Sequence, residues 1–258
     1  MTRILTYNVH RCVGNDRRLD LIRVADVIAA YEPDIVALQE LDVGRRRTGG
    51  VDQAYAIAEQ LDMACHFNAA LQVEEEQYGD AILTTLPERL VKAGPLPGLD
   101  PRVPLEPRGA LWISVTIDDA QVQILNTHLG LAPREQQRQA AALAGPDWLG
   151  REDRQGPTIL LGDFNATGAS AVYRTLTRTL RDSRRLPARK RPTSTFPAQL
   201  PLLRIDHMFV SEEIVVLSLD APYTPATRMA SDHLPLVMEF EVSQPLRNLN
   251  TSLDRTPP

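Results

Sequence analysis

The stretch LLGDFNAT, residues 160–167, decides how the fold of this chain is interpreted. Leu160 and Leu161 are typical of a strand buried in a sheet, whereas Asp163 and Asn165 are poor strand formers. Packing alone does not explain why a buried strand should end in a carboxylate and an amide. The stretch therefore predicts a polar site at the end of a buried strand.

The same arrangement recurs along the chain. Further apolar, strand-like runs end in or lead into polar side chains, which are Asn8, Glu40, His128, Asp206, Asp232 and His233. One such residue alone is typical of a cap or a turn former. Their repetition at corresponding places indicates one convergent cluster at the edge of a sheet.

The strand-like runs alternate with helical patterns. Strands are predicted at 3–8, 35–40, 80–83, 109–117, 122–127 and 157–165, and in the closing runs LLRIDHMFV, IVVLSL and LVMEFEV. Helices are predicted from an N-cap at Asp20 to Pro33, at 51–62, from Pro133 to Trp148, and at 170–179. The continuous apolar run at 35–40 is typical of a strand buried on both faces. The alternation predicts an α/β fold with two mixed sheets covered by helices.

Two segments lack a regular pattern. Residues 93–108 are rich in proline, which cannot donate to a sheet, so they are predicted as a loop or a very irregular edge strand. The tail, residues 243–258, is expected to be disordered, which leaves one domain over residues 1–242.

The composition excludes several classes of protein. With 43% hydrophobic and 24% charged residues among 258, it is typical of a globular domain, and we expect a monomer. A net charge of −5 argues against a protein that coats nucleic acid. No run approaches the length of a membrane span, and the N-terminus enters a strand without a leader, so a cytoplasmic location is expected. Cys12 and Cys65 show no metal-ligand spacing and are interpreted as thiols.

The polar cluster fits one kind of chemistry. Carboxylates without cysteine ligands suit a hard cation such as Mg²⁺, completed by water and substrate phosphate. Histidines near carboxylates donate hydrogen bonds to a phosphate or act as acid or base. Metal-assisted hydrolysis of a phosphate ester uses both sets of groups.

The ordered motifs resemble those of the endonuclease/exonuclease/phosphatase superfamily, the DNase I-like phosphoesterases. The matching motifs are TYNVH, ALQE, YGDAIL, NTHL, GDFN, RIDHMFVS and SDHLPL, which extend from about residue 3 to residue 242. The resemblance implies a four-layer α/β sandwich, in which two mixed sheets pack face to face with helices outside. It also implies a metal-dependent phosphoesterase site at one edge.

The resemblance implies a set of metal ligands. Glu40 would be the principal ligand of Mg²⁺, with Mn²⁺ as a substitute, and Asn8 and Asp232 would contribute directly or through water. Some nuclease branches carry an acidic residue two places after the first Asn, where this chain has His10. This departure argues against a nuclease-like metal arrangement, and His10 either forms a hydrogen bond near the metal or faces the wall of the site. The number of metal ions stays open.

The resemblance implies catalytic roles as well. Asp163 would orient or deprotonate the attacking water, and Asn165 would hold that water and a phosphate oxygen. His233 would lie against the scissile phosphate, with a hydrogen bond to Asp206 that favours its protonated form. His128 would donate to a non-bridging oxygen and stabilise the charge of the transition state.

The substrate-binding residues are less specific in sequence. Tyr78 is either a phosphate-contacting residue or a packing residue. Arg45 and Arg47 follow Glu40 closely, and Arg108 opens a strand; each is either a solvated charge or a guanidinium that binds phosphate. A second basic segment, Arg181–Arg191, precedes the strand that carries Asp206 and lacks the aromatic residues of a single-strand binder.

Three hypotheses of function remain. The first is a metal-dependent phosphodiesterase or phosphatase acting on a small or lipid-derived phosphoester, at a membrane surface in the lipid case. The second is a DNase-like or repair-type endonuclease with a nucleic acid substrate. The third is a binding module without catalysis, which predicts the loss of an essential group that this sequence retains.

Overall fold

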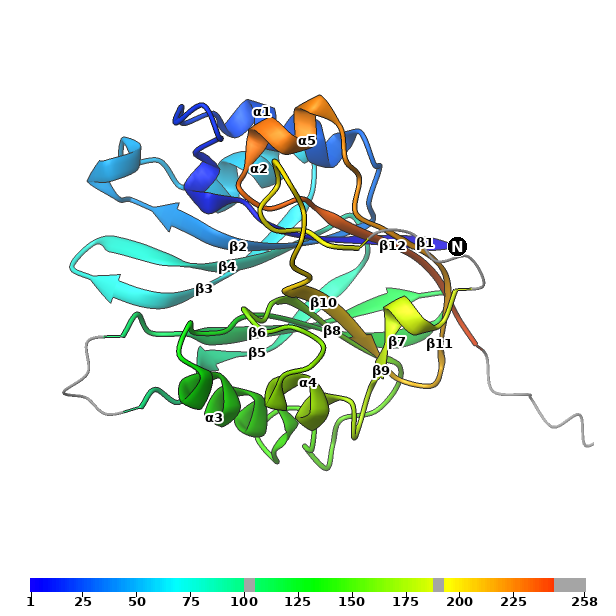
Figure 1. Ribbon diagram of the computed structural model, residues 1–258. Coiled ribbons are helices and arrows are strands. Elements are labelled where there is room, and N and C mark those ends of the chain that lie inside the picture. Colours follow the sequence, from blue (N-terminus) through cyan, green and yellow to red (C-terminus); the bar gives the residue numbers. More distant parts are fainter. Residues whose placement is uncertain (100–104, 188–192, 244–258) are drawn as a thin grey trace, which may run out of the picture.

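The computed structural model describes residues 1–99, 105–187 and 193–243. The described residues form two six-stranded sheets packed face to face, with helices on the outer side of each sheet (Figure 1). The predicted α/β sandwich with two mixed sheets is confirmed. The predicted disorder of the tail concerns residues that, from 244 onward, lie outside the described part of the chain.

The first sheet has the strand order β11-β12-β1-β2-β4-β3. β1 and β2 are parallel, and the other neighbours are antiparallel. The strands are β1 (Thr2–Asn8), β2 (Ile35–Val43), β3 (Ala64–Val73), β4 (Glu76–Thr84), β11 (Ile214–Asp220) and β12 (Leu236–Val242).

The second sheet has the strand order β5-β6-β7-β8-β10-β9. Here β7 and β8 are parallel, and the other neighbours are antiparallel. The strands are β5 (Glu88–Pro95), β6 (Gly109–Ile117), β7 (Ala120–His128), β8 (Thr158–Asp163), β9 (Arg181–Asp182) and β10 (Asp206–Val210).

The helices cover the outer faces of the two sheets. In Figure 1, α1, α2 and α5 lie over the first sheet, and α3 and α4 lie over the second. The helices are α1 (Leu21–Ala29), α2 (Gln53–Leu61), α3 (Pro133–Ala144), α4 (Ala171–Leu176) and α5 (Pro225–Ala230), with 3-10 turns η1 (His10–Cys12), η2 (Arg46–Thr48) and η3 (Ser183–Arg185). Asp20 caps α1 as predicted, because its side chain accepts from the backbone N–H of Arg23. α3 ends earlier than the predicted Trp148, because Pro146 disfavours helical backbone at the residue before it.

Three apolar clusters fill the layers. Ile35, Ala37 and their neighbours on the first sheet pack against the second sheet, while Val36 and Leu38 face α1 and α2. A third cluster lies between the second sheet and α3 and α4. The prediction that strand 35–40 is buried on both faces is confirmed. Because both sheets are packed on both faces, the ends of their central strands are held firmly in place.

The segment 93–108, predicted as a loop or an irregular edge strand, belongs in part to a regular strand. Ala93–Pro95 form the end of β5, an edge strand, so the edge-strand alternative holds there; proline is tolerated because an edge residue need not donate. Residues 100–104 of the same segment lie outside the described residues. No helix in the described ranges is long and apolar enough to cross a membrane.

Candidate functional site

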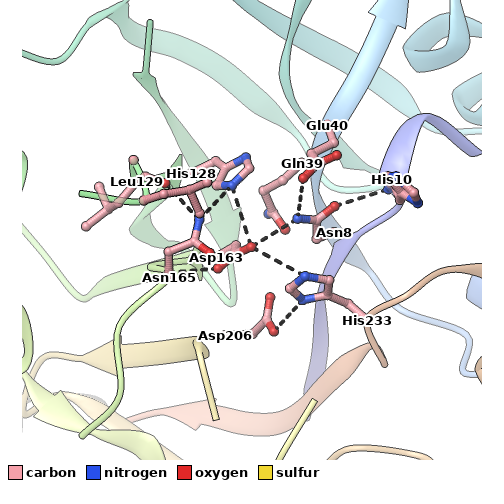
Figure 2. A network of polar contacts seen from close by, with 12 residues as sticks. Asn8, His10, Gln39, Glu40, His128, Leu129, Asp163, Asn165, Asp206 and His233 are labelled. Atoms are coloured by element: carbon pink, nitrogen blue, oxygen red, sulfur yellow. Dashed lines mark hydrogen bonds and ion pairs between the residues drawn. The ribbon is translucent and has the colours of Figure 1, made fainter. Parts of the chain in front are cut away.

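Strand ends from both sheets meet at one edge of the sandwich. His128 ends β7 and pairs across the parallel ladder with Asp163, which ends β8. Asp206 begins the antiparallel β10 and lies opposite Asp163 on its other side. Asn8 ends β1 of the first sheet, and its Nδ2 donates to Asp163 Oδ2 at 3.0 Å, which joins the two sheets (Figure 2).

A cleft of about 360 Å³ opens at this edge. Of the residues predicted from the sequence, those that line it are Glu40, Arg47, Tyr78, Arg108, His128, Asp163, Asn165, Asp232 and His233. Asn8 and Asp206 are buried and contact the lining residues through hydrogen bonds. Arg45 does not belong to the lining. The strand ends therefore bring together most of the predicted site.

The local structure of GDFN explains its composition. Gly162 has a φ of +134°, and a Cβ there would lie 1.9 Å from the carbonyl oxygen of Thr127, so only glycine fits. Asn165 has a φ of +48°, a left-handed conformation that asparagine tolerates. Its backbone N–H donates to Asp163 Oδ1 at 2.8 Å. The turn therefore fixes the Asp163 carboxylate at the strand end.

Glu40 occupies an irregularity in β2. The pairing with β4 shifts between Leu38 and Leu41, and Glu40 itself has a φ of +62°, which is uncommon for a residue other than glycine. Its Oε1 accepts from Asn8 Nδ2 at 3.0 Å. Within the described ranges, no cationic side chain forms an ion pair with it. The bulge thus exposes an uncompensated carboxylate on the cleft wall.

Asp163 lies at the centre of the network. It is 1% exposed, and its Oδ2 lies 3.6 Å from His128 Nε2 and 3.7 Å from His233 Nε2. Burial raises the pKa of Asp163, and the nearby Asp206 carboxylate raises it further, against the opposing effect of His233. Such a carboxyl group is a stronger base than an exposed aspartate.

His233 is held by a buried carboxylate. Its Nδ1 donates to Asp206 Oδ2 at 2.9 Å, and the Thr195 hydroxyl donates to the same oxygen. Burial lowers the pKa of His233, but Asp206, followed by Asp163 and Asp232, outweighs burial and raises it to about 10. His233 is therefore an imidazolium at neutral pH.

His128, in contrast to His233, is uncharged. The Arg108 guanidinium donates from Nη1 to His128 Nδ1 at 3.1 Å, and a guanidinium cannot accept, so the ring proton lies on Nε2. Burial lowers the pKa of His128, and the charges of Arg108 and His233 lower it further. His128 is thus a neutral ring with its proton on Nε2, which lies 3.6 Å from Asp163 Oδ2. The Asn165 Nδ2 lies 3.1 Å from the same ring nitrogen but, as a donor itself, it donates to the carbonyl oxygen of Leu129 at 2.9 Å.

The predicted substrate-binding residues are mostly engaged by protein groups. Arg108 pairs with Glu106 at 2.8 Å, and Arg47 forms a two-point bond with Asp42 at 2.7 and 2.6 Å. Arg45 pairs with Glu76 at 3.4 Å. The Arg47 guanidinium lies 5.5 Å from the centre of the ring of Tyr78, whose pKa is raised by burial. Tyr78 thus packs and also lines the cleft with a protonated hydroxyl.

Other basic residues noted in the sequence are placed outside the cleft. His207 is buried and bonds to the carbonyl oxygen of Ala166 at 2.7 Å, a structural role. His66 bonds to Glu88. Residues 181–187 of the Arg181–Arg191 segment do not line the cleft, and residues 188–191 lie outside the described part of the chain.

Sequence reasoning assigned no role to several groups of the site. Arg11, Glu106, Leu131 and Phe196 line the cleft, and the Phe196 ring lies 4.8 Å from the ring of His233. Thr195 holds Asp206. Glu106, Leu131, Thr195 and Phe196 lie on loops, where no periodic pattern marks them, and Arg11 lies in η1, directly after the TYNVH motif.

The donor groups fit a metal ion. Asp163, Asp206 and His233 each offer a ligand atom within 4.8 Å of the others, a set compatible with a cation. However, the Nδ1 of His233 already bonds to Asp206. Glu40, Asn8 and Asp232 offer oxygen donors of the kind that hard divalent cations prefer, and among the described residues Glu40 accepts from the Asn8 amide but forms no ion pair.

Comparison with known proteins agrees with this geometry. Residues 5–233 match the Endonuclease/Exonuclease/phosphatase family. The chain is 28% identical over 253 residues to the uncharacterized protein YbhP of Escherichia coli K12, covering 93% of this chain and 96% of YbhP. Its fold is similar to that of a functionally unknown conserved protein from Enterococcus faecalis V583, with a TM-score of 0.76, 22% identity, and coverage of 94% and 100%. It is also similar to a mannosyl-6-phosphatase of Bacteroides thetaiotaomicron, with a TM-score of 0.74, 21% identity, and coverage of 93% and 100%. The family match covers most of both sheets and every residue that lines the cleft, and the chain therefore belongs to the endonuclease/exonuclease/phosphatase family.

Proposed function

We propose that this protein is a magnesium-dependent phosphoester hydrolase that directs an activated water at phosphorus in line with the leaving group. The observation that carries the proposal is the Asn8 amide, which donates to both Glu40 and Asp163 at 3.0 Å. One side chain thereby couples the carboxylate proposed to hold the metal to the carboxylate proposed to activate water. The Glu40 side and the Asp163 side of the cleft form one connected unit.

The metal would be held by Glu40, with Asn8 and Asp232 contributing directly or through water. When bound, Mg²⁺ or its substitute Mn²⁺ neutralises phosphate charge and polarises the phosphoryl oxygens. The bulge at Glu40 supports this assignment, because strained backbone at a cleft is a common mark of a functional residue.

Asp163 and Asn165 would hold the attacking water. The backbone bond from Asn165 fixes one oxygen of Asp163 and the Asn8 amide fixes the other, so the carboxylate presents a defined direction. The raised pKa of Asp163 makes it a better proton acceptor. A water held at fixed distance and angle reacts faster because its orientation is established beforehand.

The two histidines would stabilise the transition state in different ways. Protonated His233 supplies a positive charge, and Asp206 and Thr195 hold its ring in one orientation. Neutral His128 supplies an Nε2–H whose direction is set by Arg108. Preorganised donors of this kind stabilise charge that builds on phosphoryl oxygens.

A small or lipid-derived phosphoester fits the cleft better than a nucleic acid duplex. The volume of about 360 Å³ is that of a small-molecule site, and Leu131 and Phe196 add apolar surface to its wall. Arg47 and Arg108 are paired with carboxylates, so they offer little free charge to a polynucleotide backbone. The fold likeness to a mannosyl-6-phosphatase supports a phosphomonoester among the candidates.

The test compares the wild type with Asp163→Asn on bis(p-nitrophenyl) phosphate and on plasmid DNA, each with Mg²⁺ and with EDTA. We expect metal-dependent hydrolysis of the small diester and a loss of roughly 10²-fold to 10⁴-fold in Asp163→Asn. Asp119→Asn is the matched control, because Asp119 is exposed at the opposite end of β7. An active Asp163→Asn enzyme contradicts the proposed role of Asp163 in activating water. Metal-dependent nicking of the plasmid would favour the endonuclease alternative.

A further inference from the structure

The cleft wall next to Asn8 is built from strained backbone. His10, Arg11 and Cys12 have φ values of +44°, +57° and +58°, three successive left-handed residues without a glycine. Residues in this region cost free energy and persist only where their surroundings fix them. Clustered strain of this kind is common at ligand-binding sites.

Specific bonds hold the turn in place. The backbone N–H of Cys12 donates to Val9 at 2.8 Å, and that of Val13 donates to His10 at 3.0 Å. The buried Gln53 of α2 donates from Nε2 to the carbonyl oxygen of Arg11 at 2.8 Å. Cys12 is buried in the core under α1 and α2. The fold therefore enforces the strained conformation from several sides.

The turn directs two basic side chains at the cleft. His10 and Arg11 both belong to the cleft lining. Arg11 Nη2 donates to His10 Nε2 at 2.7 Å, which leaves the His10 proton on Nδ1, 3.8 Å from Asp232 Oδ1. Arg11, His10 and Asp232 thus form a row of neighbouring side chains that extends from the cleft wall to a proposed metal ligand. Figure 2 shows His10 beside Asn8, whose Oδ1 accepts from the His10 backbone N–H.

Arg11 differs from the other arginines of the cleft in its pairing. Arg47 and Arg108 are neutralised by Asp42 and Glu106. Among the described residues, Arg11 forms no ion pair, although it is half-buried and its Nε is buried without a hydrogen-bond partner. A partly desolvated guanidinium without a carboxylate is well suited to a phosphate or carboxylate, which it binds through two parallel hydrogen bonds.

We propose that Arg11, positioned by the left-handed turn and by His10, binds a second anionic group of the substrate, distinct from the scissile phosphate. This proposal rests on the proposed function, because it assumes that the same cleft holds the reacting phosphoester. It defines the substrate class as a phosphoester that carries another phosphate or a carboxylate within reach of Arg11. The fixed turn sets the separation between the two anionic groups.

The experiment uses phosphonates, whose carbon–phosphorus bond is not cleaved by a phosphoesterase. Calorimetric titration in the presence of Mg²⁺ compares propylphosphonate with 1,3-propanediphosphonate and with 4-phosphonobutanoate. For the wild type we expect the diphosphonate to bind more tightly than the monophosphonate by about tenfold or more, as for other hydrogen bonds to charged groups. The phosphonobutanoate arm distinguishes a carboxylate from a phosphate as the preferred second group.

Variants isolate the contribution of Arg11. Arg11→Gln should reduce the affinity ratio to about two, the statistical advantage of two equivalent phosphonates, and Arg11→Lys should restore part of it. Arg17→Gln is the matched control, because Arg17 is exposed on the same connection and does not line the cleft. Melting curves confirm that each variant is folded.

The outcomes separate the two proposals. An equal ratio in wild type and Arg11→Gln, or no binding of the diphosphonate by wild type, overturns the second anion site. Phosphoester hydrolysis together with such a result leaves the proposed function standing. An Arg11-dependent ratio in a protein that hydrolyses no phosphoester supports the anion site and counts against the hydrolase.

Discussion

Replacing Asp206 with asparagine removes the buried carboxylate that holds His233. Asp206 is the largest of the influences that raise the pKa of His233, which lies near 10 instead of 6.5. At about 1.4 kcal/mol per pH unit, this difference corresponds to roughly 5 kcal/mol in favour of the charged ring. Without Asp206, burial acts against Asp163 and Asp232 alone, and we expect the pKa to fall by about 3 pH units.

The expected consequence is a change in the alkaline limb of the activity profile. If protonated His233 stabilises the transition state, activity falls as the pH rises through the pKa of His233. At about pH 8.5 the wild-type ring is almost fully protonated, whereas the Asp206→Asn ring is protonated roughly 30-fold less often. The raised pKa also stabilises the wild-type fold, by an amount that is complete below about pH 6.5 and lost as the pH rises through about 10.

The assay is the rate of hydrolysis of bis(p-nitrophenyl) phosphate between pH 6 and pH 10, together with an NMR titration of the His233 ring. Thr195→Val is the matched control, because it removes a hydrogen bond to the same carboxylate oxygen but leaves the charge. The control should keep an alkaline limb near that of the wild type. An Asp206→Asn enzyme whose alkaline limb and ring titration both stay near those of the wild type would refute the assignment of charge at His233.

Three further substitutions test other parts of the structure. Glu40→Gln should raise the Mg²⁺ concentration that gives half-maximal activity by at least about tenfold. Glu59→Gln, on the exposed face of α2, should leave that concentration unchanged. An unchanged metal response in Glu40→Gln would contradict the assignment of Glu40 as the principal ligand. Arg108→Gln should lower kcat/KM by about 10-fold to 100-fold and release the Nε2–H tautomer of His128, which nitrogen chemical shifts report; a retained tautomer would contradict the role of Arg108. Gly162→Ala should destabilise the fold by about 3 kcal/mol and lower Tm by roughly 6 to 12 °C, because its Cβ would lie 1.9 Å from the Thr127 carbonyl oxygen. Gly94→Ala, where no atom lies within 4 Å of the new Cβ, should leave Tm nearly unchanged, and equal Tm values for the two variants would refute the steric argument.

The central strands could be predicted from the sequence, but the edge strand β3 and most of the edge strand β5 could not. Residues 35–40 form a continuous apolar run because both faces of β2 are packed. β3 and β5 lie at sheet edges and are half-exposed along most of their length, so neither a buried run nor a regular alternation marks them. Their pairing with β4 and β6 is a tertiary effect that local pattern does not encode.

The candidate site shows the same division. Asp163 and His128 could be predicted because each interrupts an apolar strand, and neighbouring strand ends meet at one sheet edge. Phe196 and Thr195 lie on a loop, and their approach to His233 and Asp206 depends on how the loop folds back over the sheet. Sequence motifs thus predicted the strand-end groups that meet at the cleft better than the loop groups that contact them.

Strained backbone occurs both at site residues that the sequence predicted and at site residues that it did not. Glu40, Asn165 and the turn at His10–Cys12 all have positive φ, and all contribute to the wall of the same cleft. Each conformation is disfavoured locally, so it must be maintained by the packed sheets behind it and by bonds such as that from Gln53 to Arg11. Because the sheets are rigid, they hold these side chains in a geometry that the side chains would otherwise adopt rarely. A substitution that relaxes the turn is therefore expected to cost ligand affinity more than it costs stability, since relaxation releases strain while it misplaces Arg11.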